Sequence, residues 1–175
     1  MTTARPIASG TSQRMASVRS RDTQPELRLR RALHARGLRY RTHLRDVPGC
    51  PDLANRRRKL AVFVDGDFWH ANPEVWERRG MTSAGEQFAP DRREFWTAKL
   101  RRNSTRDSEV NARLAERGWQ VIRVWESAIR HDVDAVAEQI AAQWREARPR
   151  PGVQRLTATS ANAAPQSPSL SSNAA

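Results

Sequence analysis

Apolar residues recur with helical spacing near the start of the chain, where residues 23–37 predict one amphipathic helix. Leu29 and Leu33 fall on the same face of that helix. Thr23 and Glu26 have the spacing of a capping box, in which each side chain binds a backbone N–H group at the helix start. The predicted helix therefore has both a buried face and a defined first turn.

The three segments that follow have the patterns of strands. They are residues 38–42, 51–55 and 60–65, of which the last is almost entirely apolar. The polar residues 56–59 separate the last two segments and are typical of a tight turn, although they include neither Gly nor Asn. Such a turn places Asp52 opposite Val64 or Asp65 on the neighbouring strand. We therefore expect these segments to form a sheet.

The second half of the chain predicts two helices, one strand and a final amphipathic helix. In chain order they are residues 92–102, 104–117, 119–125 and 132–145. Trp119 and Trp125 lie on the strand and are assigned to the core. Residues 73–90 form a long insert whose two glycines favour a mobile loop, and packing of the insert against the domain is the alternative. The order of elements favours an α/β fold in one domain over residues 22–146, with a mixed central sheet flanked by helices.

Charge adds a partner to this picture, because 31 Lys and Arg against 19 Asp and Glu give a formal net charge of +12. Guanidinium groups bind phosphates bidentately, so nucleic acid is the favoured partner, ahead of a membrane. A charge that serves only solubility is the alternative. Residues 1–21 predict a basic, flexible N-terminal arm that becomes ordered on a partner. Residues 147–175, rich in Ser, Ala and Pro, predict a disordered C-terminal tail.

Cysteine content and hydropathy bear on the cellular compartment. Cys50 is the one cysteine, so the chain cannot form an intramolecular disulfide or a thiolate zinc site of its own. The first 21 residues contain no apolar run of the signal-peptide type, and no stretch is long enough to span a bilayer. We therefore expect a cytoplasmic protein that is neither exported nor embedded in a membrane.

Four residues within 19 positions have the chemistry of a metal-dependent hydrolase: Asp52, Asp65, Asp67 and His70. Hydrolysis of a phosphodiester needs a metal ion, carboxylates that hold it and a base that activates water. Asp65 and Asp67 are two residues apart, so in an extended segment they point to the same side, near the Asp52 segment. Two ordinary alternatives stay open: aspartates beside a glycine can form a turn, and a lone histidine can be a packed side chain.

Aromatic residues next to basic ones are a second candidate for function. Phe68 and Trp69 directly follow the carboxylates, and Trp96 lies within the Arg- and Lys-rich residues 92–102. Flat side chains on a basic surface can stack on bases or wedge between base pairs, most easily at a mismatch. Burial in the core is the alternative for each ring.

Three separated blocks closely resemble successive blocks of the very short patch repair (Vsr-type) DNA mismatch endonucleases. They read MASVRSRDTQPELRLRRAL, GCPDLANRRRKLAVFVDGDFWH and REFWTAKLRRNSTRDSEVNARLAERGWQVIRVWES, and the resemblance covers residues 13–130. It implies a restriction-endonuclease-like (PD-(D/E)xK-type) core. It also implies an enzyme that uses Mg²⁺ to nick DNA beside a thymine:guanine mismatch, in the repair of deaminated 5-methylcytosine.

The resemblance also implies roles for particular residues. Asp52 matches the family's metal-binding aspartate, and His70 matches the histidine that activates the attacking water. Position 64 is a metal ligand through its main-chain carbonyl, a role that Val64 can fill. Glu26 and Asp107 match acidic residues around the catalytic metals, Asp107 through metal-bound water. Both have alternatives, because Glu26 completes a capping box and Asp107 can pair with a neighbouring arginine such as Arg102 or Arg106.

Asp65 departs from the family pattern, because many members have a histidine at this position. The substitution puts in doubt any assistance that the histidine gives to the scissile phosphate, and it can create an additional metal ligand. Many members also bind a structural zinc through cysteines and histidines. This chain has Asp67, Asn72 and Ser127 at the corresponding places, and we predict no structural zinc.

In the family, residues matching Phe68, Trp69 and Trp96 intercalate beside the mismatch. Further DNA contacts are expected from basic and polar residues of the predicted helices, namely Lys99, Arg101, Arg102 and Asn103. The expected partner is double-stranded DNA with a T:G mismatch. Whether a mismatch-repair protein loads the enzyme is left open, and a monomer is consistent with nicking of one strand.

Two rival functions remain at this point. One is a nuclease of the same fold without mismatch preference, and the other is a non-catalytic DNA-binding module. The acidic residues argue against the second, because a surface that only binds DNA gains nothing from carboxylates facing phosphates.

Overall fold

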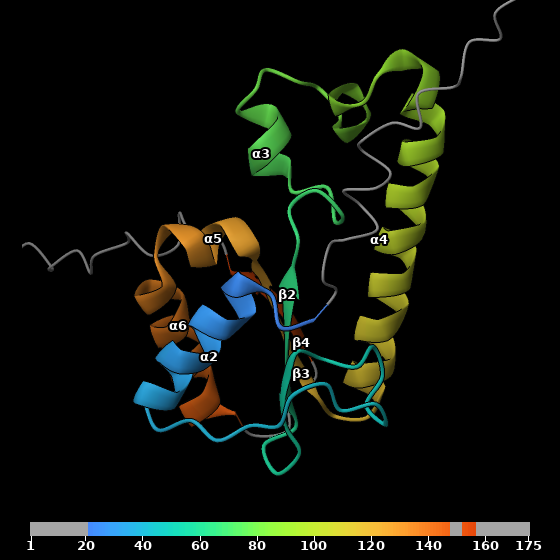
Figure 1. The fold of residues 1–175 in the computed structure, drawn as a ribbon. Coiled ribbons are helices and arrows are strands. Elements are labelled where there is room, and N and C mark those ends of the chain that lie inside the picture. Colours follow the sequence, from blue (N-terminus) through green and yellow to red (C-terminus); the bar gives the residue numbers. More distant parts are fainter. Residues whose placement is uncertain (1–20, 148–151, 157–175) are drawn as a thin grey trace, which may run out of the picture.

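A mixed sheet lies between two helical layers in the computed structural model of the chain, which describes residues 21–147 and 152–156 (Figure 1). The strands are β1 (Leu53–Asn55), β2 (Leu60–Asp65), β3 (Gln120–Trp125) and β4 (Gly152–Leu156). The helices are α2 (Gln24–Ala35), α3 (Pro73–Glu77), α4 (Arg93–Glu116), α5 (Glu126–His131) and α6 (Val133–Glu146). Helices α2, α5 and α6 cover one face of the sheet and α4 covers the other.

The strand order is β1-β2-β3-β4, with β1 antiparallel to β2 and the other neighbours parallel. This confirms the predicted α/β fold with a mixed central sheet. Leu53 pairs with Val62, and the chain turns at residues 56–59, as predicted. Helix α2 begins at the predicted N-cap Thr23, and the capping box with Glu26 is present. Helix α6 starts after Asp132, whose side chain accepts a hydrogen bond from Ala135 N at 2.8 Å.

Two predicted elements were wrong. Residues 38–42 form only one β-bridge, between Arg41 and Ala54, because the chain bends away at His43, where φ is +49°. The two helices predicted on either side of Asn103 are one continuous helix, α4. Asn103 does not interrupt it because its side-chain amide donates to Trp69 O at 2.8 Å rather than competing for the helix backbone.

The predicted terminal segments are only partly described. The arm over residues 1–21 lies outside the described residues except for Arg21. The tail prediction is wrong for Gly152–Leu156, which forms β4, because pairing with β3 supplies the backbone hydrogen bonds that composition alone does not reveal. The rest of the tail, apart from Ala147, lies outside the described residues.

Two apolar clusters hold the layers together. One joins α2, α5 and α6 to the sheet, and the other joins α4 to the opposite face. Trp119 and Trp125 are buried, as predicted. Residues 73–90 form α3 and the short 3-10 helix Ala84–Gln87 instead of an irregular loop, because Phe88 packs into the interior. Among the described helices, none is both long and apolar enough to cross a membrane.

Candidate active site

A polar cavity of about 410 Å³ opens between the ends of β1 and β2 and the middle of α4. It brings together Asp52, Asp65, His70 and Asp107, four of the residues predicted from the sequence. The other residues that line it are Arg21, His43, Gly49, Cys50, Phe63, Val64, Arg106, Val110 and Arg123. The sheet and α4 therefore meet at the site where the predicted chemistry would take place.

Asp52 sits immediately before β1 and binds the backbone of β2. Its Oδ2 accepts a hydrogen bond from Val64 N at 2.7 Å. The N–H and C=O groups of one residue in a strand point to the same edge, so the Val64 carbonyl also points toward Asp52. The β1–β2 ladder ends at the Leu53–Val62 pair, before it reaches Val64. One carboxylate and one carbonyl oxygen thus converge at this edge, and both are ligands that Mg²⁺ prefers.

The Asp52 carboxyl group is largely buried, and the positive charge of Arg30 compensates this burial only in part. Burial raises its pKa to about 7, the Val64 N–H partly opposes the rise, and the carboxylates of Glu26 and Asp65 add to it. A divalent cation at Asp52 would favour the ionised form and reverse this shift. The residues present therefore fit a metal ion at this position.

His70 is held by Asp107, which lies on α4. Its Nδ1 is 2.6 Å from Asp107 Oδ2, and the other oxygen, Oδ1, is 3.1 Å from Nη2 of Arg123. Burial opposes ionisation of Asp107, but the His70 hydrogen bond and the charges of His70, Arg123 and Arg106 outweigh it, so its pKa is lowered. An ionised Asp107 accepts the Nδ1 proton of His70, and the neutral ring then has an unprotonated Nε2.

This geometry supports an orienting role for Asp107, and the role through metal-bound water that the resemblance implies stays a prediction. Its two oxygens bind His70 and Arg123, and neither forms an ion pair with Arg102 or Arg106 within the described part of the chain. Asp65 is buried, and its Oδ1 accepts from Arg123 Nη1 at 2.8 Å.

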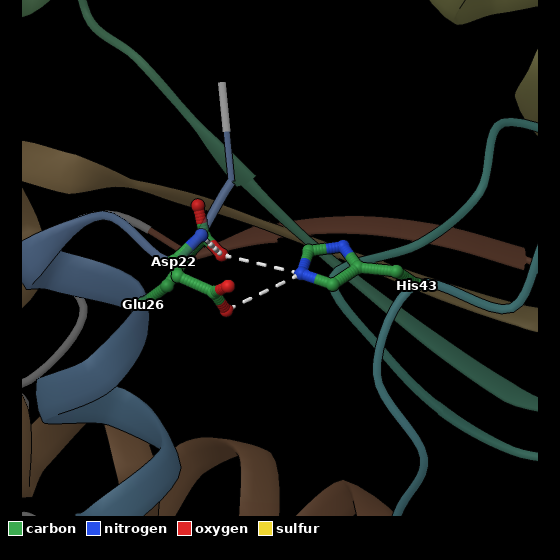
Figure 2. A group of neighbouring side chains, drawn as sticks. All are labelled: Asp22, Glu26 and His43. Carbon is green, nitrogen blue, oxygen red and sulfur yellow. Dashed lines mark hydrogen bonds and ion pairs between the residues drawn. The ribbon is translucent and has the colours of Figure 1, made fainter. Parts of the chain in front are cut away.

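A second acidic group lies at the start of α2. Asp22, Glu26 and His43 could hold a cation, because one ligand atom of each lies within 4.8 Å of the others. Figure 2 shows the His43 ring directed at both carboxylates. The guanidinium of Arg30 already lies there, with Nη2 2.9 Å from Glu26 Oε2 and 3.0 Å from His43 Nε2. The group therefore already contains a cation supplied by the chain.

Two roles were weighed for Glu26, helix capping and a place among the acidic residues around the catalytic metals. The structure shows the capping role directly. The oxygens of Glu26 bind Thr23, Arg30 and the backbone N–H of Asp22, so the helix cap and an ion pair occupy them. Glu26 still acts on the site through its charge, because it raises the pKa of Asp52.

Asp67 does not share the cavity with Asp65, and the prediction that the two point to the same side was wrong. Strand β2 ends at Asp65, and the chain turns after Gly66, so the two-residue period of a strand no longer applies. Asp67 Oδ1 instead accepts from Asn72 Nδ2 and Ser127 Oγ, each at 2.6 Å. The three positions at which the sequence departs from a zinc site are thus joined by hydrogen bonds.

The aromatic residues form one cluster above this turn. Phe68 packs edge-on against Trp69 and Trp96, with centroids 5.1 and 5.6 Å apart, and Phe88 stacks on Trp96 at 5.5 Å. The predicted rings are half-buried, and the neighbouring Phe95 is 59% exposed. They are therefore packed against one another while remaining partly accessible.

The predicted DNA-contacting residues of α4 divide into two kinds. The Nζ atom of Lys99 lies 4.8 Å from the Trp69 ring centroid and 5.1 Å from that of Trp96, so this cation covers the aromatic cluster. Arg101 and Arg102 are exposed and can reach a ligand, whereas Asn103 is half-buried and holds the backbone of Trp69.

Sequence reasoning assigned no role to Arg30, His43 or Arg123, which are basic residues at the site. Arg30 lies in the first of the three resembling blocks but was assigned no role there, and His43 lies outside these blocks. Arg123 did leave a signal, because it is one charged residue in the apolar strand QVIRVW, and a buried charge requires a partner. The sequence could not identify that partner, since Asp65 and Asp107 are distant along the chain.

Comparisons with known proteins agree with this geometry. A family model described as "DNA mismatch endonuclease Vsr" matches residues 8–78. The type II nicking enzyme V.NmeDIP of Neisseria meningitidis serogroup C is 42% identical over 126 residues, which cover 72% of this chain and 80% of that enzyme. The chain belongs to the Vsr family.

Two further relatives are similar to this chain over most of their length. The DNA mismatch endonuclease Vsr of Escherichia coli (strain K12) is 34% identical over 119 residues, 68% of this chain and 70% of its own length. The type II nicking enzyme V.HpaIIP of Haemophilus parainfluenzae is 39% identical over 110 residues, 63% of this chain and 72% of its own length. The family establishes the chain as a DNA endonuclease and confirms the resemblance seen in its sequence.

Proposed function

We propose that the chain is a magnesium-dependent endonuclease that nicks one DNA strand next to a thymine:guanine mismatch, as the first step of very short patch repair. The observation that carries the proposal is that Asp52, Val64 and the His70–Asp107 pair line one cavity. The name of the Escherichia coli relative, a DNA mismatch endonuclease, supports the mismatch as its target.

Magnesium would be held by the Asp52 carboxylate and the Val64 carbonyl. The raised pKa of Asp52 supports this assignment, because a carboxylate destabilised by burial and by neighbouring acids gains most from a cation. When bound, the ion would neutralise charge on the scissile phosphate and stabilise the leaving oxygen. Arg21 and Arg106 line the same cavity with exposed side chains and are assigned to the phosphate.

His70 is the general base in this proposal. Asp107 keeps the proton on Nδ1, so Nε2 can take a proton from the water that attacks phosphorus. The resulting imidazolium is stabilised by the ionised Asp107. This division of labour needs the ring orientation that the 2.6 Å contact supplies.

The aromatic cluster is assigned to the mismatch. A partly exposed group of rings beside a lysine can enter a base stack, and unpairing costs least where the bases are mismatched. The exposed Arg101 and Arg102 on α4 would bind the duplex backbone, an interaction that weakens steeply with salt.

The core is proposed to be restriction-endonuclease-like, supported by the placement of Asp52 immediately before β1 and of Val64 and Asp65 at the end of β2. The residues assigned to metal binding and to water activation all line one cavity of a single chain. This supports a monomer that cuts one strand.

The decisive experiment is strand cleavage of a labelled duplex with one thymine:guanine mismatch in Mg²⁺, beside the fully paired duplex. Asp52→Ala serves as the inactive control. Mismatch-selective nicking that the substitution abolishes supports the proposal. Equal cleavage of both duplexes favours a nuclease without mismatch preference, and tight binding without cleavage in any divalent metal favours a DNA-binding module.

A further inference from the structure

One arginine that lines the cavity connects the sheet to helix α4. Arg123 is in β3, paired with Phe63 of β2 in the parallel ladder, and is 2% exposed. Its guanidinium group contacts three acceptors. Nη1 donates to Asp65 Oδ1 at 2.8 Å, Nη2 lies 3.1 Å from Asp107 Oδ1, and Nε donates to Asn111 Oδ1 at 3.2 Å.

These contacts join the sheet to the middle of α4. Asp107 and Asn111 are one helical turn apart and face β3, whereas Asp65 is the last residue of β2. The central carbon of the guanidinium lies over the Phe63 ring, 4.8 Å from its centroid. The N–H groups of Arg123 therefore have acceptors, and its guanidinium also contacts an aromatic ring. A buried permanent cation requires such partners.

The contact with Asp107 extends to the catalytic base. One oxygen of Asp107 binds Arg123 and the other binds His70 Nδ1 at 2.6 Å, so the orientation of the imidazole depends on a carboxylate that the arginine holds. Asp65 Oδ1, also bound to Arg123, lies 3.9 Å from the same His70 nitrogen. A change at position 123 must therefore alter the surroundings of His70 from two directions.

We propose that Arg123 is a positioning residue for strand cleavage. It orients His70 through Asp107, and it serves as the internal counter-ion of Asp65, which is thereby assigned to the arginine and not to the metal. This inference rests on the proposed function, because it concerns the same reaction. The planar fork of arginine suits the role better than lysine does, since the three donors of an ammonium lie on one nitrogen and do not match three acceptors placed around a planar group.

The first test compares Arg123→Gln and Arg123→Lys with the unsubstituted protein. We expect Arg123→Gln to lower the single-turnover nicking rate by about 100-fold, the scale that follows from displacing a catalytic group by about 1 Å. The dissociation constant for the duplex should change by less than about twofold, because Arg123 does not face solvent. Arg123→Lys should recover part of the rate, about tenfold, because it restores one charge.

Arg36→Gln is the matched control for loss of stability. Arg36 forms ion pairs with Asp134 and Glu138 in the helical layer on the other face of the sheet, and it does not line the cavity. This control should lower the midpoint of thermal unfolding while leaving the nicking rate unchanged. The proposal is overturned if the Arg123 variants, like the control, lose thermal stability but keep their nicking rate. It is also overturned if duplex binding falls as much as the nicking rate.

A second test does not depend on activity or on the folding of Arg123→Gln. It follows Mn²⁺ binding by electron paramagnetic resonance in Asp65→Asn and Asp52→Asn. Asp65→Asn keeps an acceptor for Arg123 and removes only a nearby charge, so its affinity for Mn²⁺ should stay within about tenfold. Asp52→Asn should lose about 100-fold or more. Equal losses would make Asp65 a metal ligand and overturn its assignment to Arg123.

The outcomes also separate this inference from the function on which it rests. Mismatch-selective nicking by the unsubstituted protein that is unaffected in Arg123→Gln overturns this inference alone. Absence of nicking by the unsubstituted protein contradicts the proposed function, and the inference fails with it.

Discussion

Two groups of side chains flank Asp52, and each consists of two carboxylates, one histidine and one arginine. The inner group comprises Asp65, Asp107, His70 and Arg123, and the outer group comprises Asp22, Glu26, His43 and Arg30. One acid from each group raises the pKa of Asp52. The groups differ in exposure, because the Arg123 side chain is 3% exposed, whereas that of Arg30 is 14% exposed and that of Asp22 is 58% exposed.

The two groups have the same composition, but their histidines are bound by different residues. In the inner group a carboxylate binds His70 Nδ1, so in a neutral ring Nε2 is the nitrogen that can accept a proton. In the outer group Arg30, which can only donate, binds His43 Nε2, so the proton of a neutral His43 is on Nδ1, 3.9 Å from Asp52 Oδ1. The same four residue types therefore set one histidine to accept a proton and the other to donate one.

The largest expected effect tests this difference directly. His70→Gln should reduce the single-turnover nicking rate by about 10²–10⁴-fold, the usual contribution of a general base. His43→Gln should reduce it less than about tenfold, because this ring is assigned no proton from the attacking water. Both rates would be measured at saturating Mg²⁺ and duplex. Equal losses in the two variants would show that the partner of the ring does not decide its role.

Asp107→Asn should have the next largest effect. The amide can donate to Nδ1 of His70 and so place the ring proton on Nε2, which removes the acceptor needed for water activation. We expect the nicking rate to fall about 100-fold with little change in duplex affinity. Glu26→Gln is the counterpart in the outer group and should cost less than about tenfold, since Glu26 touches no histidine nitrogen assigned to the reaction. A larger loss for Glu26→Gln would reverse the ranking of the two groups.

Asp52 itself predicts a dependence on pH that Asp52→Asn removes. Its pKa is about 7 in the folded protein and about 4 in an unfolded chain, so the folded state binds the proton more tightly. The contribution of Asp52 to the free energy of unfolding is therefore most favourable below pH about 4, falls as pH rises to about 7, and then stays constant. The total change is about 4 kcal/mol.

Denaturant unfolding of both proteins without metal at pH 5 and pH 8 measures this effect. Asp52→Asn should gain stability relative to the unsubstituted protein as pH rises across this window, because other titrating groups cancel in the difference. Excess Mg²⁺ should shrink the difference, since a bound cation favours the ionised carboxylate. A difference that is independent of pH would mean that the raised pKa of Asp52 is not present in solution.

Sequence patterns predicted the elements whose signals are local, such as a helix cap or a regular spacing of apolar residues. Helix α2 was found because its capping box and apolar face are local, and β2 because its apolar run is uninterrupted. Helix α5 and strand β4 were missed, because the first has only 6 residues and the second exists through pairing with β3. Local patterns therefore predicted strands β1, β2 and β3 but not the fourth strand of the sheet.

The candidate site followed a similar division. Asp52 and His70 were found because both lie in one block that resembles the Vsr family, and the cavity brings them together. The inner group as a whole could not be predicted, because Arg123 meets Asp65 and Asp107 only after β2, β3 and α4 have packed. Spacing also failed for Asp67, since the strand on which the alternation depended ends at Asp65.

The smallest expected effect concerns the outer group as a helix cap. The Thr23 hydroxyl caps α2 and donates to Glu26 Oε1 at 2.9 Å. Thr23→Ala should lower the free energy of unfolding by about 1 kcal/mol, and Thr23→Ser should restore most of it. The nicking rate should change less than about twofold, because Arg30 continues to hold Glu26 at 2.9 Å. A fall in rate out of proportion to the loss of stability, measured well below the unfolding transition, would mean that the cap positions Glu26 for catalysis, and the outer group would then act on the reaction as the inner group does.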